Sequence, residues 1–444
     1  MNVQSSKFPM MRSLFILLAL AAGAAAQEPA PLPLTLRDAV NLALKQSPMV
    51  ILANLGVAQS EQQRLVARSG LLPQASVSAS EVDQRFNIEA LLGRPFPGIP
   101  EHAGPFQTFQ AGAYFEAPVF DLTLWRRYRS SQLGVDASRS GELTAREESV
   151  LLVVSQYLGS QRAAADVQSA QSQVDLAQAL YDQAADLQAH GVGTGIDTLR
   201  ANVQLQNNKQ RLIMAKTALD TSLFGLARLL NVDPHRKIDL ADQVSFFETP
   251  AAPVDQTIER AYANRPELKQ IATEERQADL ALQGAADERM PRVTVSGDWA
   301  QQGLSPASVI PAYTYQANVS VPIFTGGKIQ AERAEADLAI KQLQQKEQDL
   351  RNRIALEVKT AIAQLDSARS EVDVANQGVE LARQEVEQAR DRFQAGVANN
   401  IETITAQDEL ARANDNQIGA LYRYNQARAD LAHSAGQMEA LYAR

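Results

Sequence analysis

Cysteine is absent from this chain of 444 residues, and histidine occurs only four times. The absence of cysteine excludes disulfides, thiolate metal sites and the acylated cysteine of a lipoprotein, so we expect a protein that is not lipidated. The four histidines stand far apart and form no HExxH motif, which excludes the common zinc sites. We therefore expect neither a metal nor a cofactor.

Basic residues are also too few and too dispersed for a nucleic-acid binder. The chain carries 42 Lys and Arg against 51 Asp and Glu, for a net charge of -9, whereas phosphate backbones require a basic face. No G-x-S-x-G elbow is present, and the glycines at 191, 193 and 195 follow a predicted helix rather than the strand that a nucleotide loop needs. The sequence thus predicts a protein that is not an enzyme and binds no nucleic acid.

Long apolar runs are missing except for one short run near the N-terminus. Lys7 and Arg12 precede it, it extends over residues 14–22, and it ends in the alanines at 24–26. A membrane anchor is the alternative, but this run is too short to span a bilayer comfortably. The order of charged, apolar and small residues predicts a cleavable signal peptide over residues 1–26 and export from the cytoplasm.

The rest of the chain consists of two repeats of one structural unit. Four landmarks recur in the same order, first 218 and then 204 or 205 residues apart: Ala43–Pro48 with Ala261–Pro266, Leu71–Ser80 with Arg289–Asp298, the APVF and VPIF motifs that end at Phe120 and Phe324, and the glycine-valine turns at Gly191 and Gly396. The change in spacing indicates a longer loop in the first repeat. We expect repeats over residues 27–250 and 251–444, each reading helix, strand, loop, strand, very long helix, turn and helix.

The long helices have the apolar seam of a coiled coil. In the second repeat, apolar residues recur at alternating steps of three and four, at Val358, Ala361, Leu365, Ala368, Val372, Ala375, Val379, Ala382, Val386, Ala389 and Phe393. The first repeat has the same seam from Ala163 to Ala184. A helix over residues 124–189 would be about 100 Å long, so the sequence predicts a rod or a tube.

Four segments alternate as strands do. Tyr313, Tyr315, Ala317, Val319 and Val321 share one face, and similar apolar faces recur from Phe109 to Ala117, from Ala75 to Ala79 and from Val293 to Trp299. One alternative is a sheet packed on a soluble core, but the small polar residues on the opposite face favour a transmembrane barrel. Four strands cannot close a barrel, and open edges cannot face lipid. Two or three copies must therefore share one barrel.

These features resemble the outer-membrane efflux protein family typified by TolC, over essentially the whole mature chain. The resemblance is carried by the paired strand ends APVFD and VPIFTGG and by the paired turns at Gly191–Thr198 and Gly396–Thr403. It implies an α+β membrane protein: a homotrimer with long coiled coils in the periplasm and a shared twelve-stranded barrel in outer-membrane lipid. The loops at 85–106 and 302–311 would face outside.

The same resemblance implies an exit duct of a tripartite efflux or type I secretion system. The duct would be a passive conduit, opened at its periplasmic tip by a periplasmic adaptor and an inner-membrane pump. At that tip we expect Gly191, Val192, Gly396 and Val397 to contact the adaptor, although glycine in a tight helical turn also has a purely structural explanation. A soluble periplasmic coiled-coil scaffold or adaptor is the alternative function.

An acidic ring is the candidate gate. The family often places acidic residues just after the second turn, and the matching position here is Glu402, with Asp197 as its counterpart in the first repeat. A second acidic ring is not supported, because its position holds Thr405. A tyrosine–arginine latch found in some members would fall on Phe393 and Ala398, so it cannot be carried over. The alternative for both carboxylates is a solvated position at the start of a helix.

Overall fold

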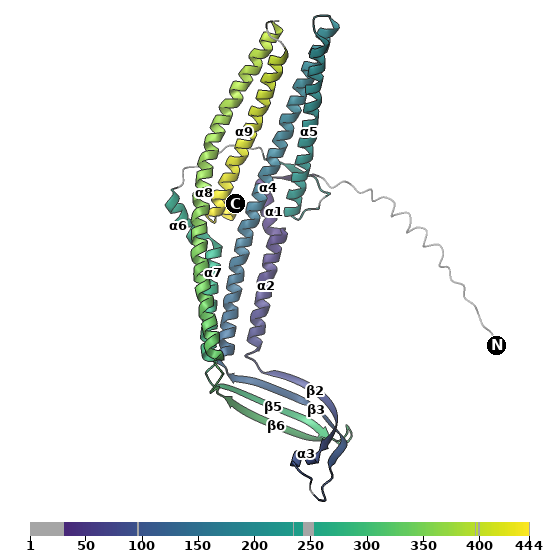
Figure 1. Cartoon of the computed structure of the whole chain (residues 1–444), viewed down its shortest axis with the longest axis vertical. Coiled ribbons are helices and arrows are strands. Elements are labelled where there is room, and N and C mark those ends of the chain that lie inside the picture. Colours follow the sequence, from purple (N-terminus) through teal and green to yellow (C-terminus); the bar gives the residue numbers. More distant parts are fainter. Residues whose placement is uncertain are drawn as a thin grey trace, which may run out of the picture.

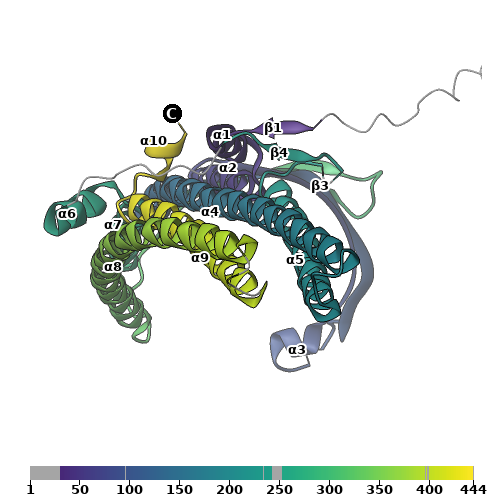
Figure 2. The ribbon, with the colours of Figure 1, turned by 90° about the horizontal axis from the view of Figure 1, so that it is seen from above.

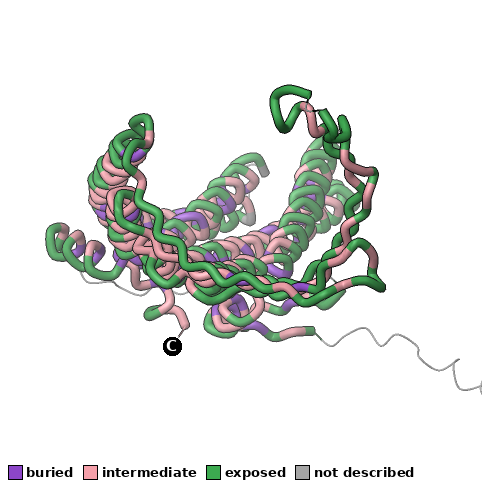
Figure 3. Tube along the Cα trace, turned by 90° about the horizontal axis from the view of Figure 1, so that it is seen from below, coloured by how far each residue is buried: buried purple, intermediate pink, exposed green. Residues whose placement is uncertain are grey.

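The computed structural model describes residues 31–95, 97–233, 235–242, 253–395, 397 and 400–443. The predicted signal peptide over residues 1–26 lies outside these residues. Two long helical hairpins extend from one end of the molecule, a sheet lies at the other end, and shorter helices pack between the middle and the sheet (Figure 1). Seen along its long axis, the chain forms a curved wall with one concave side (Figures 2 and 3).

Each hairpin pairs a very long helix with a helix of about half its length. The first is α4 (Leu122–Ala189) with α5 (Gly195–Leu229), and the second is α8 (Lys328–Gln394) with α9 (Asn400–Ser434). The long helices have 68 and 67 residues and the partners have 35 each. The side chain of Asp121 caps α4 by accepting a hydrogen bond from the Leu124 amide at 3.1 Å. The predicted rod is confirmed.

The predicted seams are the buried faces of these hairpins. In α8 the seam positions from Val358 to Ala389 are buried or half-buried, and the residues between them are mostly exposed. Ala170, Val174 and Ala177 of α4 pack on Leu205 and Leu212 of α5. Alanine at alternate seam positions lets two helix backbones approach closely, while the narrow seam leaves most of each helix surface exposed.

The sheet has four antiparallel strands. In sheet order they are β2 (Gln74–Asn87), β3 (His102–Phe120), β5 (Arg292–Gly303) and β6 (Ile310–Ser320). Val77 is opposite Ala113, Ala113 opposite Trp299, and Trp299 opposite Tyr313. These four residues were assigned to apolar faces from the sequence, so the predicted alternation is confirmed and the apolar faces join into one.

No helix covers this apolar face in the described structure. The sheet lies beyond the ends of the long helices (Figure 1), and Val77 and Trp299 are 85% and 59% exposed. A sheet packed on a soluble core would bury such side chains, so that alternative does not describe this fold. The two outer strands, β2 and β6, each have one edge without a neighbouring strand within the described residues.

Shorter elements pack along the long helices between their middle and the sheet (Figure 1). They include α1 (Leu36–Gln46), α2 (Pro48–Ser69), α6 (Val254–Asn264), α7 (Pro266–Asp287), α10 (Met438–Tyr442) and a parallel pair of strands, β1 (Leu32–Leu34) and β4 (Ile238–Leu240). Helices α1 and α6 have 11 residues each, and α2 and α7 have 22 each. The loop between β2 and β3 contains one further helix, α3 (Ile88–Leu92).

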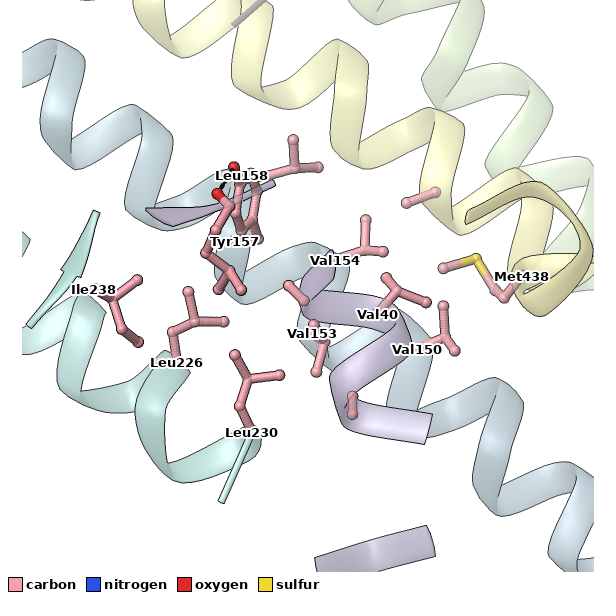
Figure 4. Close-up of a cluster of buried hydrophobic side chains, with 14 of the residues drawn as sticks. Val40, Val150, Val153, Val154, Tyr157, Leu158, Leu226, Leu230, Ile238 and Met438 are labelled. Carbon is pink, nitrogen blue, oxygen red and sulfur yellow. Dashed lines mark hydrogen bonds between the residues drawn. The ribbon is translucent and has the colours of Figure 1, made fainter. Parts of the chain in front are cut away.

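The largest apolar core lies in this middle region and joins distant parts of the chain. Figure 4 shows side chains from α1, α4, α5, β4 and α10 converging, among them Val40, Val154, Leu226, Ile238 and Met438. The Tyr157 hydroxyl donates to the carbonyl of Leu34 at 2.9 Å, and burial raises the pKa of this phenol. The core thus fastens both ends of the described chain to the long helix α4.

A buried ionic cluster lies beside this core. Arg265 is buried and forms ion pairs with Glu267 at 2.9 Å and with Glu357. Burial, and then the positive charge of Arg265, lower the pKa of His433, while Glu267, Glu357 and Glu147 act in the opposite direction. His433 Nδ1 is buried without a hydrogen-bond partner in the described structure, which also favours the neutral imidazole.

This cluster makes stability depend on pH. Histidine in an unfolded chain has a pKa of about 6.5. Because the folded value is lower, the unfolded chain takes up the proton first, and stability that is full above about pH 6.5 declines as the pH falls below it. We expect His433→Gln to flatten this decline when the apparent melting temperature is measured by circular dichroism. His190→Gln, at an exposed hairpin turn, is the control. An unchanged slope in His433→Gln would contradict the prediction.

Candidate functional site

The two hairpin turns lie at the same end of the molecule, opposite the sheet (Figure 1). In the first turn Gly191 has φ +75°, a left-handed conformation that favours glycine. The amides of Val192 and Gly193 both donate to the carbonyl of Leu187, at 3.0 and 2.9 Å, which closes the end of α4. The Val192 side chain is 77% exposed at the apex.

The described part of the second turn repeats one of these hydrogen bonds. The Val397 amide donates to the carbonyl of Arg392 at 3.0 Å, the counterpart of the bond between Val192 and Leu187, and the Val397 side chain is 70% exposed. Gly396, the other predicted contact residue, lies outside the described residues. Each turn therefore presents an exposed valine at its apex, an apolar side chain available to a partner.

A threonine ties each turn to its long helix. The Thr198 hydroxyl is 3.3 Å from the carbonyl oxygen of Ala184, and the Thr403 hydroxyl is 3.4 Å from that of Ala389. Both bonds run from the shorter helix of a hairpin back to the longer one. Both threonines end the paired turn motifs, so the sequence contained a signal for these positions. Sequence reasoning missed the hydrogen bonds themselves, because they depend on how the two helices of a hairpin face each other.

The predicted gate carboxylates both have partners within their own hairpins. The Thr194 hydroxyl donates to Asp197 in the first turn of α5, and the Asp197 amide donates to the Thr194 carbonyl at 3.1 Å. Glu402, in the first turn of α9, forms an ion pair with Arg392 of α8 at 2.9 Å. Both side chains of this pair are exposed, so the pair reduces the negative charge of Glu402 without removing it.

Polar contacts join the two hairpins to each other. Gln204 of α5 donates to Asp408 of α9 at 2.8 Å, and Gln426 of α9 donates to Ser155 of α4 at 2.9 Å. Between them, the Arg162 guanidinium lies 5.4 Å from the centre of the Tyr422 ring. Each hairpin is thus held internally by an apolar seam. Between the hairpins these polar contacts accompany apolar packing near the middle of the molecule, where Ala429 of α9 belongs to the same core as Val150 and Val154 of α4.

The described residues contain no group of three or more His, Asp or Glu placed to hold a metal ion. In the same part of the chain, no helix combines the length and apolarity needed to cross a bilayer. The features that stand out are therefore the two exposed turns and the uncovered sheet, rather than a buried pocket with catalytic side chains.

One comparison with known proteins identifies a family. The family model described as outer membrane efflux protein matches residues 39–232 and 257–437. A search of curated proteins found no match.

Solved structures of outer-membrane channels share the fold. The CmeC channel of Campylobacter jejuni matches with 19% identity and a TM-score of 0.78, over 90% of this chain and 85% of that one. VceC of Vibrio cholerae matches with 16% identity and a TM-score of 0.73, over 90% and 96%. The open MtrE channel of Neisseria gonorrhoeae matches with 16% identity and a TM-score of 0.72, over 90% and 88%.

The pairing of Glu402 with Arg392 predicts how a gate would respond to mutation. If Glu402 faces a pore, Arg392→Ala should unmask its charge and raise the cation-to-anion permeability ratio, because a ring of exposed carboxylates attracts cations. Glu402→Ala should lower that ratio. Single-channel recordings in planar bilayers measure both effects.

The control is Arg390→Ala, which removes the same charge two positions away. An equal rise in Arg390→Ala and Arg392→Ala would indicate a general charge effect rather than the ion pair. An unchanged ratio in Glu402→Ala would exclude Glu402 from the pore lining.

Proposed function

This chain belongs to the outer membrane efflux protein family, and we propose that three copies of it close into one tube across the outer membrane and the periplasm. The family consists of non-enzymatic channels, so the chain is an outer-membrane efflux channel with a periplasmic helical domain, acting in a tripartite efflux system. Family members are trimers that work with adaptor and pump partners. The homotrimer, periplasmic adaptor and inner-membrane pump of this chain are part of our proposal.

The observation that carries the proposal is a four-stranded sheet with an uncovered apolar face and two free edges. Strands β2 and β6 expose backbone groups that would cost several kcal/mol each in lipid if they stayed unpaired. Pairing β2 of one copy with β6 of the next satisfies them. Three copies then give twelve strands, above the minimum of about eight for a membrane barrel.

The two faces of the sheet suit the two sides of such a barrel. The apolar row through Val77, Trp299 and Tyr313 would face the hydrocarbon, while the opposite row through Ser76, Tyr114, Asp298 and Thr314 would line a water-filled lumen. The concave side of the chain (Figures 2 and 3) would then face the tube axis. In this arrangement transport is passage through water, and no side chain performs chemistry on the solute.

The two repeats, over residues 27–250 and 251–444, would each supply one strand pair and one hairpin. The matching lengths of α1 and α6, of α2 and α7, and of α5 and α9 support this division. Export would use the predicted signal peptide over residues 1–26, which lies outside the described residues, and the mature chain would carry no lipid.

The hairpin turns would form the periplasmic tip. Gly191, Val192, Gly396 and Val397 would contact the adaptor, and the two exposed valines support this assignment. Glu402 and, less directly, Asp197 would contribute charge near the entrance. The contact between Gln204 and Asp408, near the turns, is polar, so the tip ends of the hairpins could separate while the apolar core nearer the middle stays packed, and adaptor and pump would open the tip in this way.

A soluble periplasmic scaffold or adaptor is the alternative function that the sequence alone leaves open. It would share the coiled coils but would have to leave the apolar face of the sheet in water. Fractionation distinguishes the two proposals, since a channel is recovered with the outer membrane and released by detergent. Recovery of the mature chain in the soluble periplasmic fraction would contradict the channel.

Val192→Asp tests the tip. Placing a charge at the apex should weaken an apolar contact with the adaptor, so cells that depend on this chain should become more sensitive to its transported compounds while outer-membrane recovery stays normal. The control is Thr217→Asp, which adds the same charge to α5 roughly 30 Å from the turn. Growth inhibition is measured in a deletion strain that carries each variant. Full complementation by Val192→Asp would remove Val192 from the adaptor contact.

A further inference from the structure

A polar groove lies between α2 and α4 and reaches α7, with a volume of about 710 Å³. Ligand sites usually enclose about 300–1,000 Å³, so the groove has room for a small solute. Its polar lining consists of side-chain amides, hydroxyls and one guanidinium, among them Gln59, Ser60, Gln63, Arg127, Ser130 and Gln277. None of the described residues that line it carries a carboxylate. Although the chain has a net charge of -9, this groove is therefore locally positive.

The groove opens on the concave side of the wall. Helix α1 lies on the convex side (Figure 2) and shares a core with Val150 and Val154 of α4, which identifies the convex face of that long helix. Counting back from Val150 at about 100° per residue, Ser130 and Gly134 both lie about 160° around α4. These two residues line the groove, so they place it on the opposite, concave face.

Hydrogen-bond donors in this groove are available to a solute. Arg127 is exposed and forms no ion pair with another described residue, whereas its neighbour Arg126 pairs with Asp287 at 2.9 Å. The side-chain amides of Gln63 and Gln277 likewise hydrogen-bond to no other described residue. A guanidinium holds a carboxylate through two parallel hydrogen bonds, and amides and hydroxyls both donate and accept. The set thus suits an organic anion whose body carries further hydroxyl or carbonyl groups.

The cavity on the convex side of α2 and α4 is charged differently. Glu61 there pairs with Arg64 at 3.0 Å and with Arg139 at 2.9 Å, and Asp136 also lines it. The arginines on that side therefore stand beside carboxylates, which would repel an anion. Of the two cavities, the concave groove is the one that combines an arginine with a lining free of carboxylates.

We propose that the concave groove between α2 and α4 binds polar organic anions as they pass through the tube, with Arg127 holding the carboxylate and the amides and hydroxyls holding the body. This inference rests on the proposed closed tube, since only there does the concave side become a lumen. Three copies would present three such grooves at one height, in the part of the helical tunnel nearest the barrel.

Such grooves would favour anionic over neutral solutes at that height. Binding has to be weak, because a solute in transit must leave as readily as it enters. Glu402, in contrast, lies in the first turn of α9, at the hairpin end of the molecule. A cation preference at the tip and anion binding in the groove are therefore separate properties of the channel.

Gluconate and sorbitol are matched probes for this groove, because both are polyols and gluconate carries a carboxylate where sorbitol has a hydroxyl. We expect purified full-length protein in detergent to bind gluconate more tightly than sorbitol when titrations are followed by saturation-transfer difference NMR. Arg127→Gln should raise the dissociation constant of gluconate about 5-fold, as expected for two charges that stay in contact with water. The dissociation constant of sorbitol should not change.

The control is Arg129→Gln, which removes the same charge from an exposed position about 60° around α4 from Val150, on the convex side. This variant should bind both probes as the unmodified chain does. Gluconate binding that is unchanged in Arg127→Gln, or that weakens equally in Arg127→Gln and Arg129→Gln, would overturn the proposed anion site.

Light scattering on the same samples tests the tube separately. A trimer whose gluconate binding depends on Arg127 but not on Arg129 would support the proposal. A trimer without such binding would overturn the groove and leave the channel proposal standing. Binding that depends on Arg127 in a chain that stays monomeric would overturn the closed tube and, with it, the role of the groove in transit.

Discussion

Unpaired backbone groups along two strand edges are the constraint on which this architecture depends. Strands β2 and β6 leave one row of N–H and C=O groups each without a strand partner in the described chain, and a bilayer offers no water to satisfy them. The apolar face of the sheet at the same time requires contact with lipid. One copy cannot meet both demands, whereas a ring of copies meets both and leaves the polar face around a central lumen.

The helical part extends the ring that the strands begin. Strand β3 ends at Phe120 and α4 begins at Leu122, with Asp121 between them as the helix cap. The chain therefore continues from the sheet into the long helix within two residues. Narrow alanine seams bind the helices in pairs but leave broad surfaces exposed, as expected of helices that have further neighbours in a closed tube. The core around Tyr157 and Leu226 fastens this wall at mid-height.

The sequence predicted the features that depend on local periodicity. The seam from Val358 to Ala389 and the alternation through Val77 and Trp299 follow from helix and strand repeats, so the structure confirms both. The ion pair of Arg392 and Glu402 was missed because it depends on how two helices align across a turn. The cluster of Arg265 with Glu357 and His433 was missed because its members come from three separated places in the chain, namely the junction of α6 and α7, helix α8 and helix α9. The gate role of Glu402 and the signal peptide over residues 1–26 stay predictions, as does the adaptor contact of the turns.

Closure of the ring through its strand edges can be measured directly in this cysteine-free chain. Ser78→Cys near the middle of β2 is combined with one cysteine at successive positions of β6 (310–320), since paired strands bring Cα atoms within disulfide range. The account predicts that at one register oxidation converts the protein into a covalent trimer that migrates as a single band on denaturing gels and reverts on reduction. Monomers at every register, or products that stop at dimers, would contradict it.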